Sequence, residues 1–420
     1  MPVELRTEWL ANPEGLDSPS PRLSWKLQSS LRAQRQTGYR ILVASSAQAL
    51  ESSLGDLWDS GKVASEESIS RPYAGKPLAS GQKCYWRVKV WDQNDQESDW
   101  SEVGSWSMGL LQPKDWKAAW ISIRDKTPVH RDRDKLHLPP ARYFRKEFPV
   151  NKTIRRATLF ASSLGIHEFY LNGKRVGDAF FEPGWSDYSK RAYYRTHDVT
   201  GLLKPGTNAV GAILADGWYA GYVGYGLLVG YGPYRTGRSF YGKTPALYAQ
   251  LEVEYSDGTR AWWGTDPSWS VTEQGPIREA DLIMGESYDS RAELIGWAEP
   301  GFDARSWAAC VRAEENGSIR AVFSDTLGDR EVDLGFRAPP VMQAYSAPPI
   351  RVTQELPALS VAKPNPGVYL FDFGQNFAGV VRVKLRGVRG DQVQIRYGEM
   401  LHPDGRLMTE NLRRARATDT

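Results

Sequence analysis

Strict alternation of apolar and polar side chains limits most strongly what this chain can fold into. In residues 83–92, KCYWRVKVWD, the even positions from Cys84 to Val90 are apolar, and Arg87 and Lys89 lie between them. Residues 247–255, LYAQLEVEY, repeat this period of two. Such alternation places successive side chains on opposite faces of a half-buried strand. No long segment has the period of an amphipathic helix, so we predict an all-β fold of tandem β-sandwich or jelly-roll domains.

The residues between the alternating segments also favour sheets. The chain has 39 Gly and 26 Pro, and both residue types are common at turns. Asn-Gly at 172–173 separates two alternating runs and predicts a tight hairpin, and Ser-Asp-Gly at 256–258 predicts a second. The one stretch with helical character, residues 46–57, begins at Ser46, a residue type that caps helix N-termini.

Changes of pattern divide the chain into domains. Residues 1–111 contain several short strand patterns and predict a small β-sandwich. Residues 112–142 are charged, contain Pro and lack periodicity, so we interpret them as a linker. Alternation resumes within residues 143–310, a second β domain. It sharpens again within residues 311–420, in VYLFDFGQNFAGVVRVKLRG and DQVQIRYGE, which predict a third.

The charge balance and the reactive residues exclude several classes of function. With 53 basic and 50 acidic residues, the net charge of +3 gives no electrostatic footprint for nucleic acid. Two cysteines cannot form a disulfide framework, and five histidines without ligand spacing do not indicate a metal site or a catalytic triad. The sequence shows no secretory leader pattern and no apolar run near the roughly 18 residues of a membrane span. We therefore expect a cytoplasmic protein that binds neither nucleic acid nor membrane.

Two short motifs that combine Trp and Asp give the best binding signal. They are PGWSDY at residues 183–188 and ADGWYAG at residues 215–221, and their candidate side chains are Trp185, Asp187, Tyr188, Asp216, Trp218 and Tyr219. An indole offers a flat apolar face to a sugar ring, and a carboxylate accepts hydrogen bonds from hydroxyls or coordinates calcium. The alternative is that both tryptophans fill a sandwich core, since large aromatic side chains are usually well buried.

A third motif, GESYDSR, contains Glu286 and Asp289 beside Arg291. Glycoside hydrolysis requires two carboxyl groups at a defined separation, one of them with a raised pKa. The guanidinium of Arg291 would lower the pKa of both acids by ion pairing, so we interpret the motif as structural or sugar-contacting rather than catalytic. Asp372 and Glu399 form a second carboxylate pair that the sequence leaves open.

Three runs of residues, in chain order, resemble consecutive domains of bacterial α-L-rhamnosidases. LRTEWLANPEGLDSPSPRLSWKL, with YWRVKVWDQN and WSMGLL, is similar to their immunoglobulin- or fibronectin-like first domain. LNGKRVGDAFFEPGWSDYSKRAYYRTHDVTGLLKPGTNAVGAILADGWYAG, followed by GESYDSR, resembles their amino-terminal jelly-roll domain. YLFDFGQNFAGVVRVKLRGVRGDQVQIRYGEMLHPDGRL is similar to their concanavalin-like domain. The resemblance thus gives each of the three β domains a counterpart.

The resemblance implies an accessory role. In that family a helical barrel with the catalytic acid and base follows the concanavalin-like domain, so we expect no catalytic residue within residues 1–420. The barrel, on the same or a separate chain, is then an expected partner. Some members bind L-rhamnose and calcium in the jelly-roll module, which makes rhamnose-containing glycans expected ligands and calcium a candidate but not a required cofactor. The alternatives are a stand-alone lectin-like glycan-binding protein and a hydrolase with an unrecognised carboxylate pair.

Overall fold

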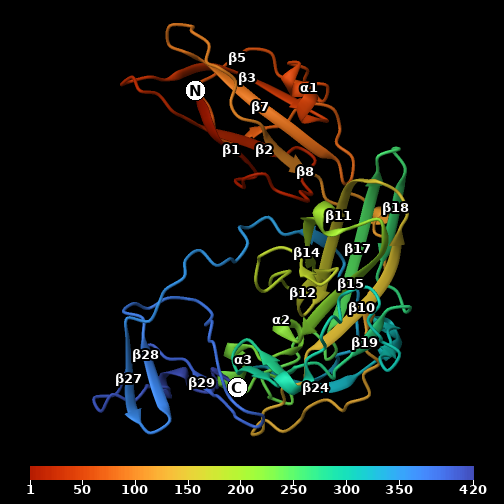
Figure 1. Ribbon diagram of the computed structural model, residues 1–420, viewed down its shortest axis with the longest axis vertical. Helices are drawn as coiled ribbons and strands as arrows, with labels where there is room; N and C mark the ends of the chain where they lie inside the picture. Colours follow the sequence, from red (N-terminus) through yellow and green to blue (C-terminus); the bar gives the residue numbers. More distant parts are fainter.

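The amino-terminal region is a sandwich of two antiparallel sheets (Figure 1). The computed structural model describes residues 1–420. The smaller sheet has the order β1 (Pro2–Thr7), β2 (Arg22–Leu27), β6 (Arg71–Pro72). The larger has the order β4 (Trp58–Asp59), β3 (Gln36–Ala44), β7 (Lys83–Asp92), β8 (Gly104–Ser107), with β5 (Val63–Ala64) also paired to β3. The apolar face predicted for β7 is buried in their common core, together with Trp106.

The central region is a larger sandwich. One sheet has the order β13 (Lys174–Arg175), β12 (Ile166–Leu171), β15 (Gly206–Ala215), β10 (Arg142–Val150), β19 (Ser270–Thr272), β22 (Ala308–Ala309). The other has the order β23 (Val311–Arg312), β9 (Ile121–Ser122), β17 (Ala246–Tyr255), β11 (Ile154–Leu164), β14 (Ala192–Asp198), β26 (Met342–Ala344), with β18 (Arg260–Gly264) paired to β17. Twenty-two buried residues, contributed mainly by the inner faces of both sheets, form the largest hydrophobic core of the molecule.

Smaller elements lie around the central sandwich. They are the ladder β16 (Gly232–Pro233), β24 (Arg320–Asp325), β25 (Gly328–Asp333), the hairpin β20 (Ile277–Asp281), β21 (Gly285–Tyr288), and the helices α2 (Gly217–Ala220) and α3 (Gly224–Val229). Only two short ladders follow residue 345, β27 (Ser360–Asn365) with β28 (Val368–Asp372), and β29 (Ile395–Arg396) with β30 (Thr418–Asp419). The hairpin of β27 and β28 stands away from the rest of the molecule (Figure 1).

The predicted helix start and the predicted hairpin turn are confirmed, although the helix ends at Glu51 rather than near residue 57. α1 (Ala47–Glu51) begins after Ser46, whose hydroxyl accepts a hydrogen bond from the backbone N–H of Ala49 at 3.2 Å. Asn172 and Gly173 have φ angles of 50° and 79°, the left-handed pair that a type I′ hairpin turn requires. No α-helix is longer than the six residues of α3, which agrees with the all-β prediction. None is long and apolar enough to cross a membrane.

The sheets divide the chain differently from the sequence pattern. The segment that we interpreted as a linker, residues 112–142, contributes β9 to the central sandwich, where Ile121 pairs with Leu247 of β17. β23 and β26 lie beyond residue 310, yet both belong to the same central sheet. Short strands of this kind carry too few residues for a visible period, because their position is fixed by the neighbouring strand rather than by their own alternation.

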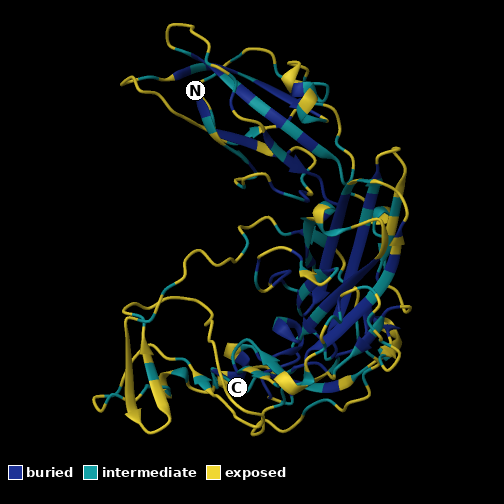
Figure 2. Cartoon of the chain, viewed as in Figure 1, coloured by how far each residue is buried: buried dark blue, intermediate teal, exposed yellow.

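The carboxyl-terminal region also differs from the expectation in one respect. Residues 380–386, VVRVKLR, alternate as a strand would, but they form no ladder and their side chains are exposed (Figure 2). The side chains of Val381, Val383 and Leu385, which share one face of the pattern, are exposed to solvent. Alternation defines the two faces of a strand, but a ladder forms only where a second strand supplies hydrogen-bonding partners.

Candidate functional site

Aromatic side chains from two separate segments meet beside α2. The indoles of Trp185 and Trp218 are stacked, with ring centroids 5.9 Å apart and planes 2° from parallel. Phe181 approaches Trp218 edge-on at 6.3 Å. Trp185 is 49% exposed and Phe181 38% exposed, whereas Trp218 is half-buried. These three side chains, which we call the aromatic platform, present a surface of apolar rings to solvent.

The two tyrosines of the same motifs belong to the core. Tyr188 and Tyr219 are buried and pack edge-to-face at 5.4 Å, and Tyr241 contacts Tyr188 at 5.0 Å. Burial raises the pKa of both buried phenols above the ordinary tyrosine range. Both rings belong to the buried cluster on which Trp218 packs, so they have almost no exposed surface for the ligand contact that the sequence predicted. Sequence reasoning also missed Phe181, although it stands only two residues before the PGWSDY motif.

Asp216 forms ion pairs with two arginines inside the protein, Arg142 and Arg238. Its carboxylate is 3% exposed, accepts a hydrogen bond from Arg142 at 3.0 Å and a second, shorter one from Arg238. Arg142 also lies 3.4 Å from the carboxylate of Glu273. A buried carboxylate whose two oxygens are each engaged by a guanidinium has no accessible position for a ligand hydroxyl. Asp216 is therefore a structural residue, and it directly precedes the helix that carries Trp218.

Asp187 lies close to the platform on an exposed turn. One carboxylate oxygen accepts hydrogen bonds from the backbone N–H and the hydroxyl of Ser189, at 3.1 and 2.5 Å. The other oxygen lies 3.4 Å from the ammonium of Lys190. The hydrogen bonds from Ser189 and the charge of Lys190 lower the pKa of Asp187 below its ordinary value. Its second oxygen, held only by a solvent-exposed lysine, remains able to accept a hydrogen bond from a ligand.

These residues do not fit a calcium site. Calcium takes six to eight oxygen ligands, several of them carboxylates. Asp216 is occupied by two cationic side chains, and Asp187 faces a lysine. No group of three or more His, Cys, Asp or Glu side chains in residues 1–420 is arranged to hold a metal ion. The side chains of this region therefore provide no cage for the candidate cofactor.

The GESYDSR motif forms β21 and the turn after it, at a separate place. Arg291 pairs with Asp289 through two hydrogen bonds of 2.7 and 2.6 Å, which lower the pKa of that carboxyl to about 2. Glu286 behaves differently, because desolvation and the neighbouring carboxylate of Asp419 raise its pKa. The expectation that Arg291 lowers both pKa values is thus wrong for Glu286, whose side chain does not reach the guanidinium.

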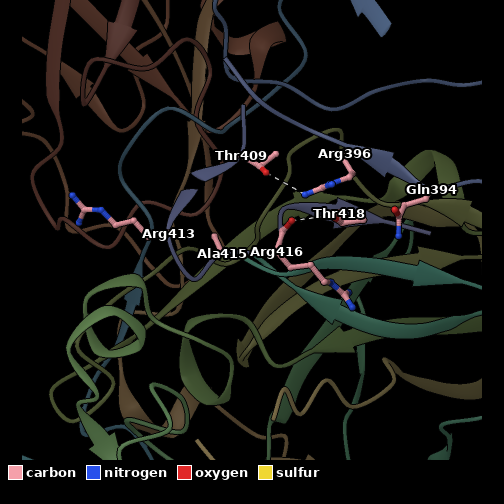
Figure 3. A pocket seen from close by; sticks show the side chains of 7 residues that line it. All are labelled: Gln394, Arg396, Thr409, Arg413, Ala415, Arg416 and Thr418. Atoms are coloured by element: carbon pink, nitrogen blue, oxygen red, sulfur yellow. Dashed lines mark hydrogen bonds between the residues drawn. The ribbon is translucent and has the colours of Figure 1, made fainter. Parts of the chain in front are cut away.

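A polar cavity of about 350 Å³ is formed by the paired strands β29 and β30 and by the segment that connects them (Figure 3). Its walls are Gln394, Arg396, Thr409, Arg413, Ala415, Arg416 and Thr418. Arg416 is fixed by a 2.9 Å hydrogen bond to the carbonyl of Met284 and a 2.8 Å ion pair with Glu279. No carboxylate lines this cavity, so it cannot provide the acid and base of a glycosidase.

Three domain families match consecutive parts of the chain. Residues 2–112 match the Rha78A-like N-terminal immunoglobulin domain. Residues 152–353 match the alpha-L-rhamnosidase N-terminal domain. Residues 362–420 match the bacterial alpha-L-rhamnosidase concanavalin-like domain. Together they cover the chain almost from end to end.

Longer proteins are also similar to the chain. An alpha-L-rhamnosidase of Alteromonas sp. is 35% identical over 100% of this chain and 42% of its own length. The structure of Streptomyces avermitilis alpha-L-rhamnosidase in complex with L-rhamnose superposes with a TM-score of 0.85, at 30% identity, over 100% of this chain and 53% of that one. The structure of the Dictyoglomus thermophilum enzyme gives 0.83 at 34% identity, over 100% and 43%. The chain thus spans about half the length of these relatives or somewhat less, and the lectin-like alternative is not favoured.

Proposed function

Because the chain belongs to the bacterial α-L-rhamnosidase family, we propose that its residues form an accessory β region that supports a catalytic domain and binds rhamnosides. The matched domains are the amino-terminal and concanavalin-like ones. The relatives include a further part beyond the region they share with this chain. We propose that this further part carries the hydrolytic activity and that residues 1–420 do not.

The carboxylates of the chain support this division. Asp289 is held ionised by Arg291, and Glu286, whose pKa is raised, has Asp419 rather than a cleft-facing base as its close acidic neighbour. Asp372 accepts a hydrogen bond from the backbone N–H of Gly374 in an exposed turn. A glycosidase needs an acid and a second carboxylate facing one another across a sugar. Neither of the two candidate pairs has that environment.

The observation that carries the binding proposal is the aromatic platform. L-Rhamnose, the ligand named for the Streptomyces structure, has C–H faces and a C6 methyl group that gain from contact with aromatic rings. Trp185 offers an exposed indole held flat against Trp218, so little side-chain entropy is lost when a sugar stacks on it. Asp187 supplies the nearby acceptor. So few contacts give weak binding, on the order of millimolar to micromolar.

Isothermal titration with L-rhamnose tests the proposal. We expect the wild type to bind, and Trp185→Ala to lose most of the affinity while its circular dichroism stays unchanged. Trp9→Ala is the matched control, because Trp9 is a similarly exposed tryptophan (55%) in the amino-terminal sandwich. Since no calcium cage is present near the platform, a chelator is expected to leave the affinity unchanged. Equal affinities for the wild type and Trp185→Ala, or no binding by the wild type, would reject the platform as the site.

A further inference from the structure

The central sandwich has an opening between its two sheets, away from the aromatic platform. The cavity measures about 160 Å³ and is bounded by β10, β11, β15, β17, β18 and the turn before β19. Its apolar lining comprises Phe148, Leu159, Val210, Ala249, Leu251, Trp262, Trp263 and Trp269. Trp263 packs on Phe148 with ring centroids 5.0 Å apart. The walls are therefore the inward faces of both sheets, extended by indole rings.

Two charged side chains, Lys146 and Asp266, line the cavity beside these apolar residues. Lys146 lines the cavity from β10, at a position between Phe144 and Phe148, both of which are buried in the core. Its ammonium donates hydrogen bonds to the hydroxyl and carbonyl oxygens of Ser268, at 2.8 and 3.3 Å. Neither partner is a carboxylate. An ammonium has three N–H donors and Ser268 accepts two of them, so the half-buried side chain of Lys146 keeps a donor for a further oxygen atom.

We infer that this cavity binds a small aromatic ring that carries a hydroxyl group, a ligand of the size and chemistry of phenol. The volume supports a single ring, because an apolar protein cavity of ~150 Å³ remains dry and takes up benzene. The indoles of Trp263 and Trp269 provide aromatic neighbours, and aromatic pairs add attraction beyond the area that they bury. Lys146 at the rim supplies a charged donor for the hydroxyl oxygen. A sugar, with hydroxyls around its whole ring, would leave most of them unpaired against these walls.

Phenol is the probe, with benzene as the comparator that lacks the oxygen. Titration is followed by tryptophan fluorescence, to which the three lining indoles contribute, and by the rise in melting temperature. We expect saturable binding to the wild type. Ala249→Leu fills part of the cavity and is expected to lower phenol affinity about tenfold or more, because the ring loses its space. Ala249→Val is the milder second variant should Ala249→Leu fail to fold.

Lys146→Met separates the polar contact from the apolar one. Loss of a hydrogen bond to a charged group is expected to weaken phenol binding roughly tenfold while benzene affinity stays unchanged. Trp185→Ala is expected to leave phenol binding intact, which distinguishes this cavity from the platform. The inference is overturned if the wild type shows no saturable binding of phenol. It is equally overturned if the cavity-filling variant binds phenol as tightly as the wild type.

Discussion

The indole planes of Trp185 and Trp218 lie 2° from parallel although the two residues come from different segments of the central region. Trp218 belongs to α2, a single turn of helix too short to be stable by itself. The residue before it, Asp216, is tied to Arg142 and Arg238. The orientation of the platform therefore depends on a buried ionic cluster.

The first prediction concerns this cluster. Asp216→Asn removes the only anionic partner of Arg238 and leaves two guanidiniums buried with less compensation, so we expect a loss of about 3–5 kcal/mol in the free energy of unfolding. Asp187→Asn alters an exposed turn and is expected to cost less than about 1 kcal/mol. Urea unfolding followed by circular dichroism measures both. Similar stabilities for the two variants would show that the cluster does not hold the fold.

The second prediction concerns pH. His167 is 2% exposed, its Nδ1 lies 2.9 Å from the hydroxyl of Ser163, and burial lowers its pKa to about 3. Because this pKa is below the ordinary value of about 6.5, the unfolded chain binds the proton more readily between pH 3 and 6.5. Stability is then complete above pH 6.5 and falls by about 1.4 kcal/mol for each pH unit below it.

Unfolding at pH 7 and pH 5 measures this effect. Most carboxylates with a lowered pKa lose their contribution to stability only below about pH 4. A change in stability between pH 7 and pH 5 therefore reports on buried histidine. His167→Asn retains a polar side chain beside Ser163 but cannot take up the proton, and we expect it to be less sensitive to pH than the wild type. A wild type as stable at pH 5 as at pH 7 contradicts the assignment of a buried neutral imidazole.

The third prediction concerns activity. Purified residues 1–420 are expected not to hydrolyse p-nitrophenyl α-L-rhamnoside, because neither carboxylate pair has the environment of an acid and a base facing a sugar. The release of p-nitrophenol is measured for the wild type, Glu286→Gln and Asp372→Asn. Turnover that one of these substitutions abolishes would establish a hydrolytic site within the chain.

The fourth prediction concerns association. The region that follows residue 345 is largely exposed (Figure 2). Its exposed large apolar side chains include Leu359, Val361, Val368, Tyr369, Phe371, Val383 and Leu385. An exposed apolar patch favours contact between molecules. Sedimentation is expected to show self-association that increases with concentration and that Val361→Ser with Phe371→Ser reduces. Val103→Ser, at an exposed valine of the amino-terminal sandwich, serves as the control. A chain that stays monomeric at every concentration would refute this prediction.

Local features of the fold could be predicted from the sequence because they depend on neighbouring residues. The alternation from Cys84 to Val90 defines a buried face whatever strand lies beside it, and all four even positions are buried. The cap at Ser46 and the hairpin at Asn172 and Gly173 involve only three or four consecutive residues. The three runs that resemble consecutive α-L-rhamnosidase domains could likewise be identified, in their order, from the sequence alone.

Only the tertiary structure separated the roles of the candidate site residues. Trp185, Tyr188, Asp216 and Trp218 stand in two similar motifs, yet two are buried and two contribute to an exposed platform. Arg142 lies 74 residues from Asp216 along the chain, and sheet pairing rather than sequence proximity brings them into contact. Segments that are distant in the sequence decide whether a carboxylate is exposed to water, available to a sugar or paired with a guanidinium. The sequence therefore determined which side chains could form a site, and long-range packing decided which of them remain free to do so.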